Sequence, residues 1–238
     1  MLPRVHQFAT SALLIDELCE RIAALAHQSC ARRGSFSIVL AGGNTPHILY
    51  RRLSKLPADW QCWHIYFSDE RCLPARDPDR NDSMAAAAWL DHVAIPDHQI
   101  HRVPAGGSAA AAATAYASVL EQVSAFDLVL LGLGEDGHTA SLFPGDPQVA
   151  SGGALAIAVD NAPKPPPTRV SMSPDCLSRA AAVWFVVTGD SKREALEAWL
   201  AGAPLPPQSI NAPGGIDVFT DICVGCRDAR ELPRPSVV

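Results

Sequence analysis

The stretch Phe36-Ser-Ile-Val-Leu-Ala-Gly-Gly-Asn-Thr-Pro46 predicts the fold class of this chain. Its first five residues form a largely apolar run, which is typical of a strand covered on both faces. Two glycines follow, and then Pro46, which is tolerated at the first position of a helix. The stretch therefore predicts a strand, a tight turn and a helix that begins at Pro46. This is the unit from which parallel α/β sheets are built.

Four more apolar runs predict further strands, at 64–67, 127–131, 155–159 and 183–187. Helical apolar spacing lies before, between and after the strands, at 13–26, 46–56, 84–91, 108–123 and 191–201. Buried strands that alternate with helices indicate parallel crossovers. We therefore predict an α/β fold, with a doubly wound, mostly parallel sheet that carries helices on both faces.

Composition and charge narrow the class of protein. The chain has 238 residues, of which 48% are hydrophobic, and we expect one domain over 1–238 because no convincing linker divides it. The formal charge of -6 and the absence of a Lys/Arg-rich run argue against nucleic acid and membrane partners. Acidic residues interrupt the apolar N-terminal stretch, which predicts neither a signal peptide nor a membrane span.

The seven cysteines form an odd, scattered set. This argues against a complete disulfide framework and suits the reducing cytosol, so we expect a cytoplasmic protein. Cys223 and Cys226 form the only CxxC pair. Without further ligands nearby in sequence, a zinc site there has weak support, and we expect buried packing and no metal.

In the predicted sheet, residues that directly follow the strands are candidates for a ligand site. After the first strand, Gly42 and Gly43 permit close backbone approach, and Asn44 and Thr45 stand at the expected helix start. The amides and positive dipole end of that helix favour a phosphate. A plain glycine turn with an Asn or Thr cap explains the six residues 41–46 equally well.

After the second strand, Ser68-Asp-Glu-Arg71 forms a dense charge cluster. Arg71 is suited to bind an anion or a polarised carbonyl. A salt bridge from Arg71 to Asp69 or Glu70 is the alternative.

After the third strand, the segment 131–145 contains Gly132-x-Gly134-x-x-Gly137. The spacing matches the dinucleotide fingerprint, but Pro144, Gly145 and Pro147 interrupt the helix that such a site needs. We therefore predict no nicotinamide cofactor. What remains is a flexible loop that places His138 beside Asp136. An imidazole near a carboxylate is suited to accept a proton from water.

Three cations follow downstream. The proline-rich segment 163–167 is expected to hold Lys164 in a stiff extended loop, and Arg169 precedes another apolar pair. Lys192 stands at a helix start, where a cation opposes the dipole and needs compensation from Asp190 or from a bound anion.

Taken in order, the segments AGGNTP (41–46), FSDERCLP (67–74), LGLGEDGHTASLFPG (131–145), PKPPPTRVSM (163–172) and VTGDSK (187–192) resemble the motif series of the 6-phosphogluconolactonase family. The resemblance implies a fold shared with glucosamine-6-phosphate deaminases and ribose-5-phosphate isomerases. It implies a cofactor-independent enzyme of the oxidative pentose phosphate pathway that hydrolyses 6-phospho-D-glucono-1,5-lactone. Related deaminases carry an acidic sequence where this chain reads Ser141-Leu-Phe-Pro144, which favours the lactonase.

The resemblance also implies roles for the candidate residues. His138 would be the general base, Arg71 would contact the substrate, and Gly43, Asn44, Thr45, Arg169 and Lys192 would surround it, chiefly at its phosphate. We further expect Asp136 to take part in catalysis and Gly42 and Asp69 to bind substrate. The stretch Asn81-Asp-Ser-Met84 departs from the family's pattern. An amino-sugar-phosphate isomerase or deaminase and a non-catalytic sugar-phosphate sensor remain the alternatives, and either a monomer or a homodimer is expected. Every role depends on one spatial condition, that the turns at Asn44 and His138 meet at one cleft.

Overall fold

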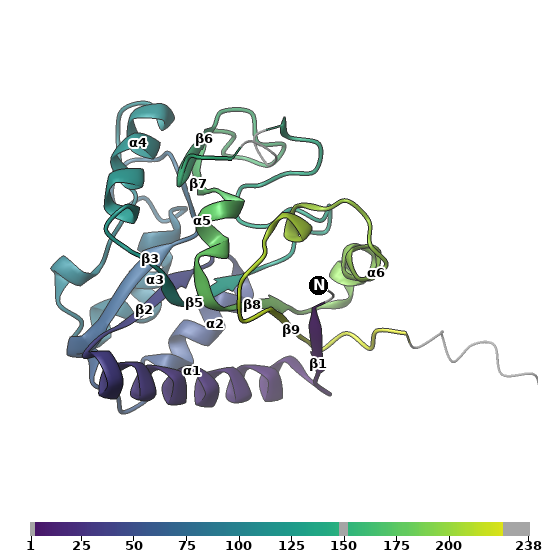
Figure 1. The fold of residues 1–238 in the computed structure, drawn as a ribbon, viewed down its shortest axis with the longest axis horizontal. Coiled ribbons are helices and arrows are strands. Elements are labelled where there is room, and N and C mark those ends of the chain that lie inside the picture. The colour runs from purple at the N-terminus through teal and green to yellow at the C-terminus, as the bar shows by residue number, and fades with distance from the viewer. Residues whose placement is uncertain (1–2, 148–151, 226–238) are drawn as a thin grey trace, which may run out of the picture.

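The computed structural model describes residues 3–147 and 152–225 of the chain. Six strands form one parallel sheet in the order β1-β9-β8-β5-β2-β3 (Figure 1). Their bounds are β1 Arg4–Gln7, β9 Ile216–Thr220, β8 Ala180–Val187, β5 Phe126–Leu131, β2 Phe36–Leu40 and β3 Trp63–Phe67. The predicted α/β class with a mostly parallel sheet is confirmed. The two strands at the β1 edge were not predicted.

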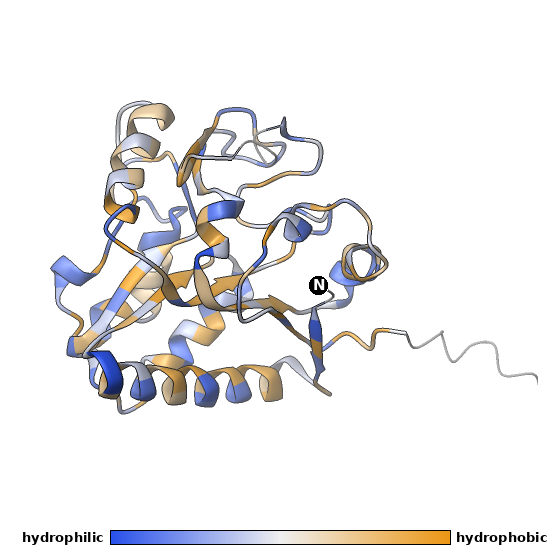
Figure 2. Cartoon of the chain, in the orientation of Figure 1, coloured by the Kyte–Doolittle hydropathy of each residue, from blue (hydrophilic) through white to orange (hydrophobic). Residues whose placement is uncertain are grey.

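Helices cover both faces of this sheet. On one face lie α1 Ser11–Arg33, α2 Asn44–Leu53 and α3 Asn81–Ala88, and on the other lie α4 Ala109–Leu120, α5 Pro174–Ser178 and α6 Arg193–Leu200. Each face of the sheet has its own core: the first lies under α1, α2 and α3, and the second under α4, α5 and α6. Along β5, Leu128 and Leu130 pack into the first core, whereas Val129 and Leu131 pack into the second. Successive side chains of a strand point to opposite faces, so a continuous apolar run is buried twice. Figure 2 shows this hydrophobic middle of the sheet, against mixed colours along α1.

A second, three-stranded sheet has the order β4-β7-β6, with β4 Asp69–Arg71, β7 Arg169–Met172 and β6 Ala156–Val159. All its pairings are antiparallel. The prediction that 155–159 belongs to the parallel sheet was therefore wrong. The connection 160–168 from β6 to β7 is shorter than the crossover that a parallel pair requires. The charge cluster at 69–71 forms strand β4 of this sheet, which the sequence did not predict.

Capping residues set the helix bounds beyond what apolar spacing indicated. Helix α1 begins after Thr10, whose side chain accepts a hydrogen bond from the Leu13 amide, and it ends at Gly34, whose φ is 74°. Helix α2 begins at Asn44, so Pro46 is its third residue rather than its first. The first amides of a helix have no partner within it, and a proline there costs no hydrogen bond.

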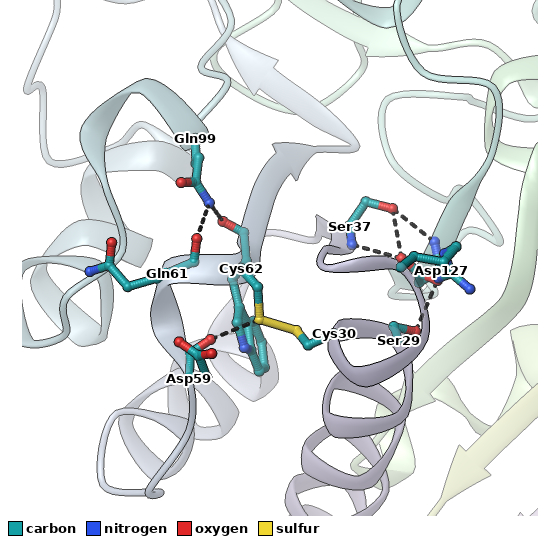
Figure 3. Close-up of a disulfide and its surroundings, with 10 residues drawn as sticks. Ser29, Cys30, Ser37, Asp59, Gln61, Cys62, Gln99 and Asp127 are labelled. Carbon is teal, nitrogen blue, oxygen red and sulfur yellow. Dashed lines mark hydrogen bonds and ion pairs between the residues drawn. A yellow bond between two sulfur atoms is a disulfide. The ribbon is translucent and has the colours of Figure 1, made fainter.

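Two cysteines pair across the first core, as Figure 3 shows. Cys30, in the last turn of α1, forms a disulfide with Cys62, which ends the short 3-10 turn Trp60–Cys62 before β3. This pairing was not expected, because the spacing of two distant cysteines gives no sign of it. Cys223 is exposed and disulfide-bonded, so the expectation of buried packing was wrong for that residue, and Cys226 lies outside the described residues.

Removing the Cys30–Cys62 disulfide should lower the stability of the fold. The cross-link closes a sequence separation of 32 residues, and the loop-entropy relation then gives about 4 kcal/mol of unfolding free energy. We expect the double variant Cys30→Ser/Cys62→Ser to melt about 10 °C below the oxidised protein in calorimetry. Dithiothreitol should lower the midpoint of the oxidised protein toward that of the variant. Equal midpoints for variant and oxidised protein would contradict the expectation.

Candidate active site

The carboxyl ends of β2 and β5 lie side by side in the parallel sheet, and the second sheet stands beyond them (Figure 1). A pocket of about 190 Å³ opens there. Its walls come from both sheets and their loops: Ala41, Gly42, Gly43, Ser68, Asp69, Arg71, Asn81, Gly132, Leu133, Gly134, His138, Thr139, Ala140, Arg169 and Lys192. The glycine turn after β2 and the histidine loop after β5 therefore share one cleft.

His138 is held by its own loop. The amide of Gly134 donates to the carbonyl of His138 at 2.8 Å, and Gly137, with φ of 82°, makes the turn between them. The imidazole Nδ1 lies 2.5 Å from Asp136 Oδ1. In the neutral ring a proton on Nδ1 is donated to this carboxylate, which leaves Nε2 as the acceptor. Asp136 supports His138 without lining the pocket, and Lys164 Nζ lies 3.4 Å from the same oxygen.

Burial and neighbouring charges together set the protonation state of this pair. Burial lowers the pKa of His138, and the hydrogen bond and charge of Asp136 oppose that shift without cancelling it. Burial would raise the pKa of Asp136, but His138 and Lys164 lower it overall. At neutral pH the pair is therefore a neutral imidazole beside an ionised carboxylate, which is the form that accepts a proton.

Two arginines face each other across β4 and β7. The antiparallel register pairs Arg71 with Arg169, and both line the pocket. Arg169 is only 5% exposed, and its guanidinium donates from Nε to the Pro166 carbonyl at 2.9 Å and from Nη2 to the Lys164 carbonyl at 3.0 Å. The proline-rich segment thus orients Arg169. Like charges placed opposite each other on a sheet repel, so the pair favours a bound anion.

Arg71 does not form the alternative salt bridge to Asp69 or Glu70. Its Nη1 donates to the backbone carbonyl of Asp79, and its buried Nε has no hydrogen-bond partner among the described residues. A buried N–H without a partner is costly. Arg71 therefore keeps one N–H without a protein partner in the ranges that the structure describes, while its side chain lines the pocket.

Lys192 pairs with Glu135 of the histidine loop and not with Asp190, its neighbour in sequence. Its Nζ lies 3.5 Å from Glu135 Oε1, while Asp190 pairs with Arg193 at 2.6 Å. Of the charged residues that line the pocket, three are cations (Arg71, Arg169 and Lys192) and one, Asp69, is an acid. This excess of positive charge suits a dianion such as a phosphate ester.

Two predicted phosphate contacts lie outside the pocket walls. Asn44 is exposed, and the Thr45 hydroxyl lies 2.6 Å from the Thr188 hydroxyl and lines a neighbouring cavity. Because α2 begins at Asn44, the pocket meets the backbone turn of Gly42 and Gly43 instead of these side chains. Their predicted contact with phosphate stays a prediction.

A buried polar network that the sequence did not reveal holds the β4 wall. Glu70 is fully buried, and its carboxylate accepts hydrogen bonds from the amides of Arg71, Asn81 and Asp82 at 2.7 to 2.8 Å. Asn81 lines the pocket and donates from Nδ2 to the Asp69 carbonyl at 2.9 Å. The departure at 81–84 therefore borders the site. The sequence signal that could have revealed this network is the charged cluster directly after an apolar run. A carboxylate buried at such a position needs several hydrogen-bond donors around it.

Ser141 contacts Asp69, the one acidic residue among the described residues that line the pocket. Its hydroxyl donates to Asp69 Oδ2 at 2.6 Å, and Arg169 Nη1 lies 4.0 Å from the same oxygen.

Among the described residues no group of three or more His, Cys, Asp or Glu side chains is placed to hold a metal ion. Nor is any helix of residues 3–147 and 152–225 long and apolar enough to cross a bilayer.

The fold and the pocket are those of a known family. The model of the family described as "Glucosamine-6-phosphate isomerases/6-phosphogluconolactonase" matches residues 9–218, and the chain belongs to this family. The 6-phosphogluconolactonase of Mycobacterium tuberculosis is 36% identical over 239 residues, covering 94% of this chain and 96% of the relative. That of Synechocystis is 39% identical over 205 residues, covering 82% and 84%. The predicted resemblance to the lactonases of the family is confirmed.

Solved structures agree with this assignment. The crystal structure of 6-phosphogluconolactonase from Thermotoga maritima superposes with a TM-score of 0.85 at 25% identity, over 92% of this chain and 99% of that one. A monomeric glucosamine-6-phosphate deaminase superposes with a TM-score of 0.78 at 19% identity, over 91% and 96%. The second likeness shows a shared fold alone, as the motifs implied.

Proposed function

We propose that the protein hydrolyses 6-phospho-D-glucono-1,5-lactone to 6-phosphogluconate, a step of the oxidative pentose phosphate pathway, with His138 as the general base. One observation carries the proposal. The Nδ1 of His138 is held by Asp136, and the imidazole lines the same pocket as Arg71, Arg169 and Lys192. A base and a set of cations in one small cleft suit an ester that carries a phosphate.

The reaction follows from these positions. Nε2 of His138 removes a proton from a water molecule, whose oxygen attacks the lactone carbonyl carbon. The carbonyl oxygen becomes an oxyanion, and the guanidinium of Arg71, which lines the pocket, supplies a donor for it. One such donor contributes about 3 kcal/mol to the transition state. The ring C–O bond then breaks, and the leaving ring oxygen takes the proton from His138. The product is a carboxylic acid, which ionises at neutral pH.

The phosphate is placed by charge. Arg169 and Lys192 bring positive charge to the pocket from the second sheet and from the segment before α6, and the Gly42–Gly43 turn brings backbone close to the cleft. Holding the phosphate fixes the lactone ring relative to the imidazole, which is the positional part of the catalysis.

The proposal predicts the acid limb of the pH profile. Only neutral His138 acts as a base, so activity rises as pH rises through its pKa, which burial holds below the ordinary 6.5. We expect kcat/KM to be flat near pH 7 and to fall on the acid side with a midpoint below 6.5. In Asp136→Asn the midpoint should move further to the acid side, because Asp136 raises the pKa of His138. A midpoint that moves upward in this variant contradicts the assignment.

The activity itself is tested with freshly generated lactone. Stopped-flow proton release should show ring opening well above the spontaneous rate. Two alternatives have their own readouts: ammonia release from glucosamine 6-phosphate would indicate a deaminase, and tight binding of 6-phosphogluconate without hydrolysis would indicate a sensor. Hydrolysis no faster than the spontaneous reaction would overturn the proposal.

A further inference from the structure

A second cavity lies beside the start of α1 and along α2. Its volume is about 370 Å³, and it shares no lining residue with the catalytic pocket. The hydrogen-bonded hydroxyls of Thr45 and Thr188 form part of its wall, so the first turn of α2 separates the two pockets. A cavity of this size is within the range of small-molecule sites.

One side of this cavity is apolar. Ile15 of α1 is buried beside it, and Ile48 of α2 remains 56% exposed. Among the described residues, Ile48 and Leu13 are the exposed large hydrophobic side chains, and they lie on these two neighbouring helices. An isoleucine left uncovered at the mouth of a cavity offers a surface that an apolar ligand would bury.

The other side is cationic. Arg51, Arg52 and Lys55 line the cavity against a single acid, Asp16. Arg52 Nη2 pairs with Asp16 Oδ1 at 2.6 Å, whereas Arg51 and Lys55 have no acidic partner within the described part of the chain. Arg51 and Arg52 lie in the last turn of α2, where the helix dipole favours cations, and Lys55 follows the end of the helix. Two uncompensated positive charges beside exposed isoleucine, in a protein of net charge -6, still make a local anion attractor.

We propose that this cavity binds a small organic anion with an apolar body, independently of the proposed catalytic function. The body packs against Ile15 and Ile48, and the anionic group lies at Arg51 and Lys55. Neither half suffices alone, because exposed cations bind simple anions weakly and the apolar wall is small. The site therefore selects amphipathic anions over inorganic phosphate and over neutral aromatic molecules.

The test uses the fluorescent anion 8-anilinonaphthalene-1-sulfonate with the full-length native protein. We expect saturable binding of one equivalent, and weaker binding of its neutral analogue N-phenyl-1-naphthylamine. Arg51→Glu should weaken sulfonate binding about tenfold, and Ile48→Ser should weaken the binding of both probes. Arg32→Glu is the matched control, since Arg32 is also an exposed cation in the last turn of a helix and has no acidic partner in the described residues. It should bind like the unaltered protein.

Three results would overturn the proposal. Equal weakening in Arg51→Glu and Arg32→Glu would show a response to net charge alone. Loss of binding in Arg169→Met, with binding kept in Arg51→Glu, would place the probe in the catalytic pocket. Absence of saturable binding to the folded protein would also overturn it. Circular dichroism melts of each variant verify that a change in binding is not a change in folding.

Discussion

Replacing His138 by alanine should lower kcat by at least about a hundredfold and leave KM nearly unchanged. The imidazole lies in the pocket wall with Nδ1 committed to Asp136, so its removal takes away the proton acceptor. It leaves Arg71, Arg169 and Lys192 in place to bind the phosphorylated ring. Steady-state kinetics on freshly generated lactone, corrected for spontaneous opening, separate the two constants.

His98→Ala is the control for this variant, because His98 is exposed and does not line the pocket. It should hydrolyse the lactone at the unaltered rate. If His138→Ala keeps its kcat, or if KM rises while kcat stays constant, His138 binds substrate and is not the base.

Gly134→Ala should lower kcat by a similar amount, although the new methyl group carries no chemistry. A Cβ at this position would lie 2.0 Å from His138 Nδ1 and 2.4 Å from Asp136 Oδ1. Carbon cannot approach these atoms so closely, so the imidazole or the carboxylate must move and their hydrogen bond must break. Misplacing a catalytic group by about 1 Å costs on the order of a hundredfold in rate.

Nitrogen NMR of the His138 ring measures this displacement independently of activity, because the Nδ1 signal depends on its hydrogen bond. The matched variant is Gly132→Ala, where a Cβ meets no atom within 4 Å and the Nδ1 signal should remain that of a hydrogen-bonded ring. Full activity in Gly134→Ala with a shifted ring signal would show that the Asp136 contact has no part in catalysis.

The loop that holds His138 could be located from the sequence because its geometry is local. Asp136 and His138 are two residues apart, and glycines at 134 and 137 provide the turn that joins their side chains. The pocket wall formed by β4 and β7 was harder to predict. Asp69 and Arg71 were singled out as charges after a strand, but their strand and its partner β7 were not predicted. An apolar run signals burial, and says nothing of which neighbour a strand will pair with.

What the sequence alone determined is therefore the strand–turn–helix units, the alternation that buries the parallel sheet, and the pairing of His138 with Asp136. Tertiary structure decided the rest: the antiparallel register that sets Arg71 opposite Arg169, the reach of Lys192 to Glu135, and the disulfide between Cys30 and Cys62. The physical reason is the separation in sequence between the residues that interact. Turns and helix caps are fixed by bonds between near neighbours, whereas contacts between distant segments form only when the whole core closes around them.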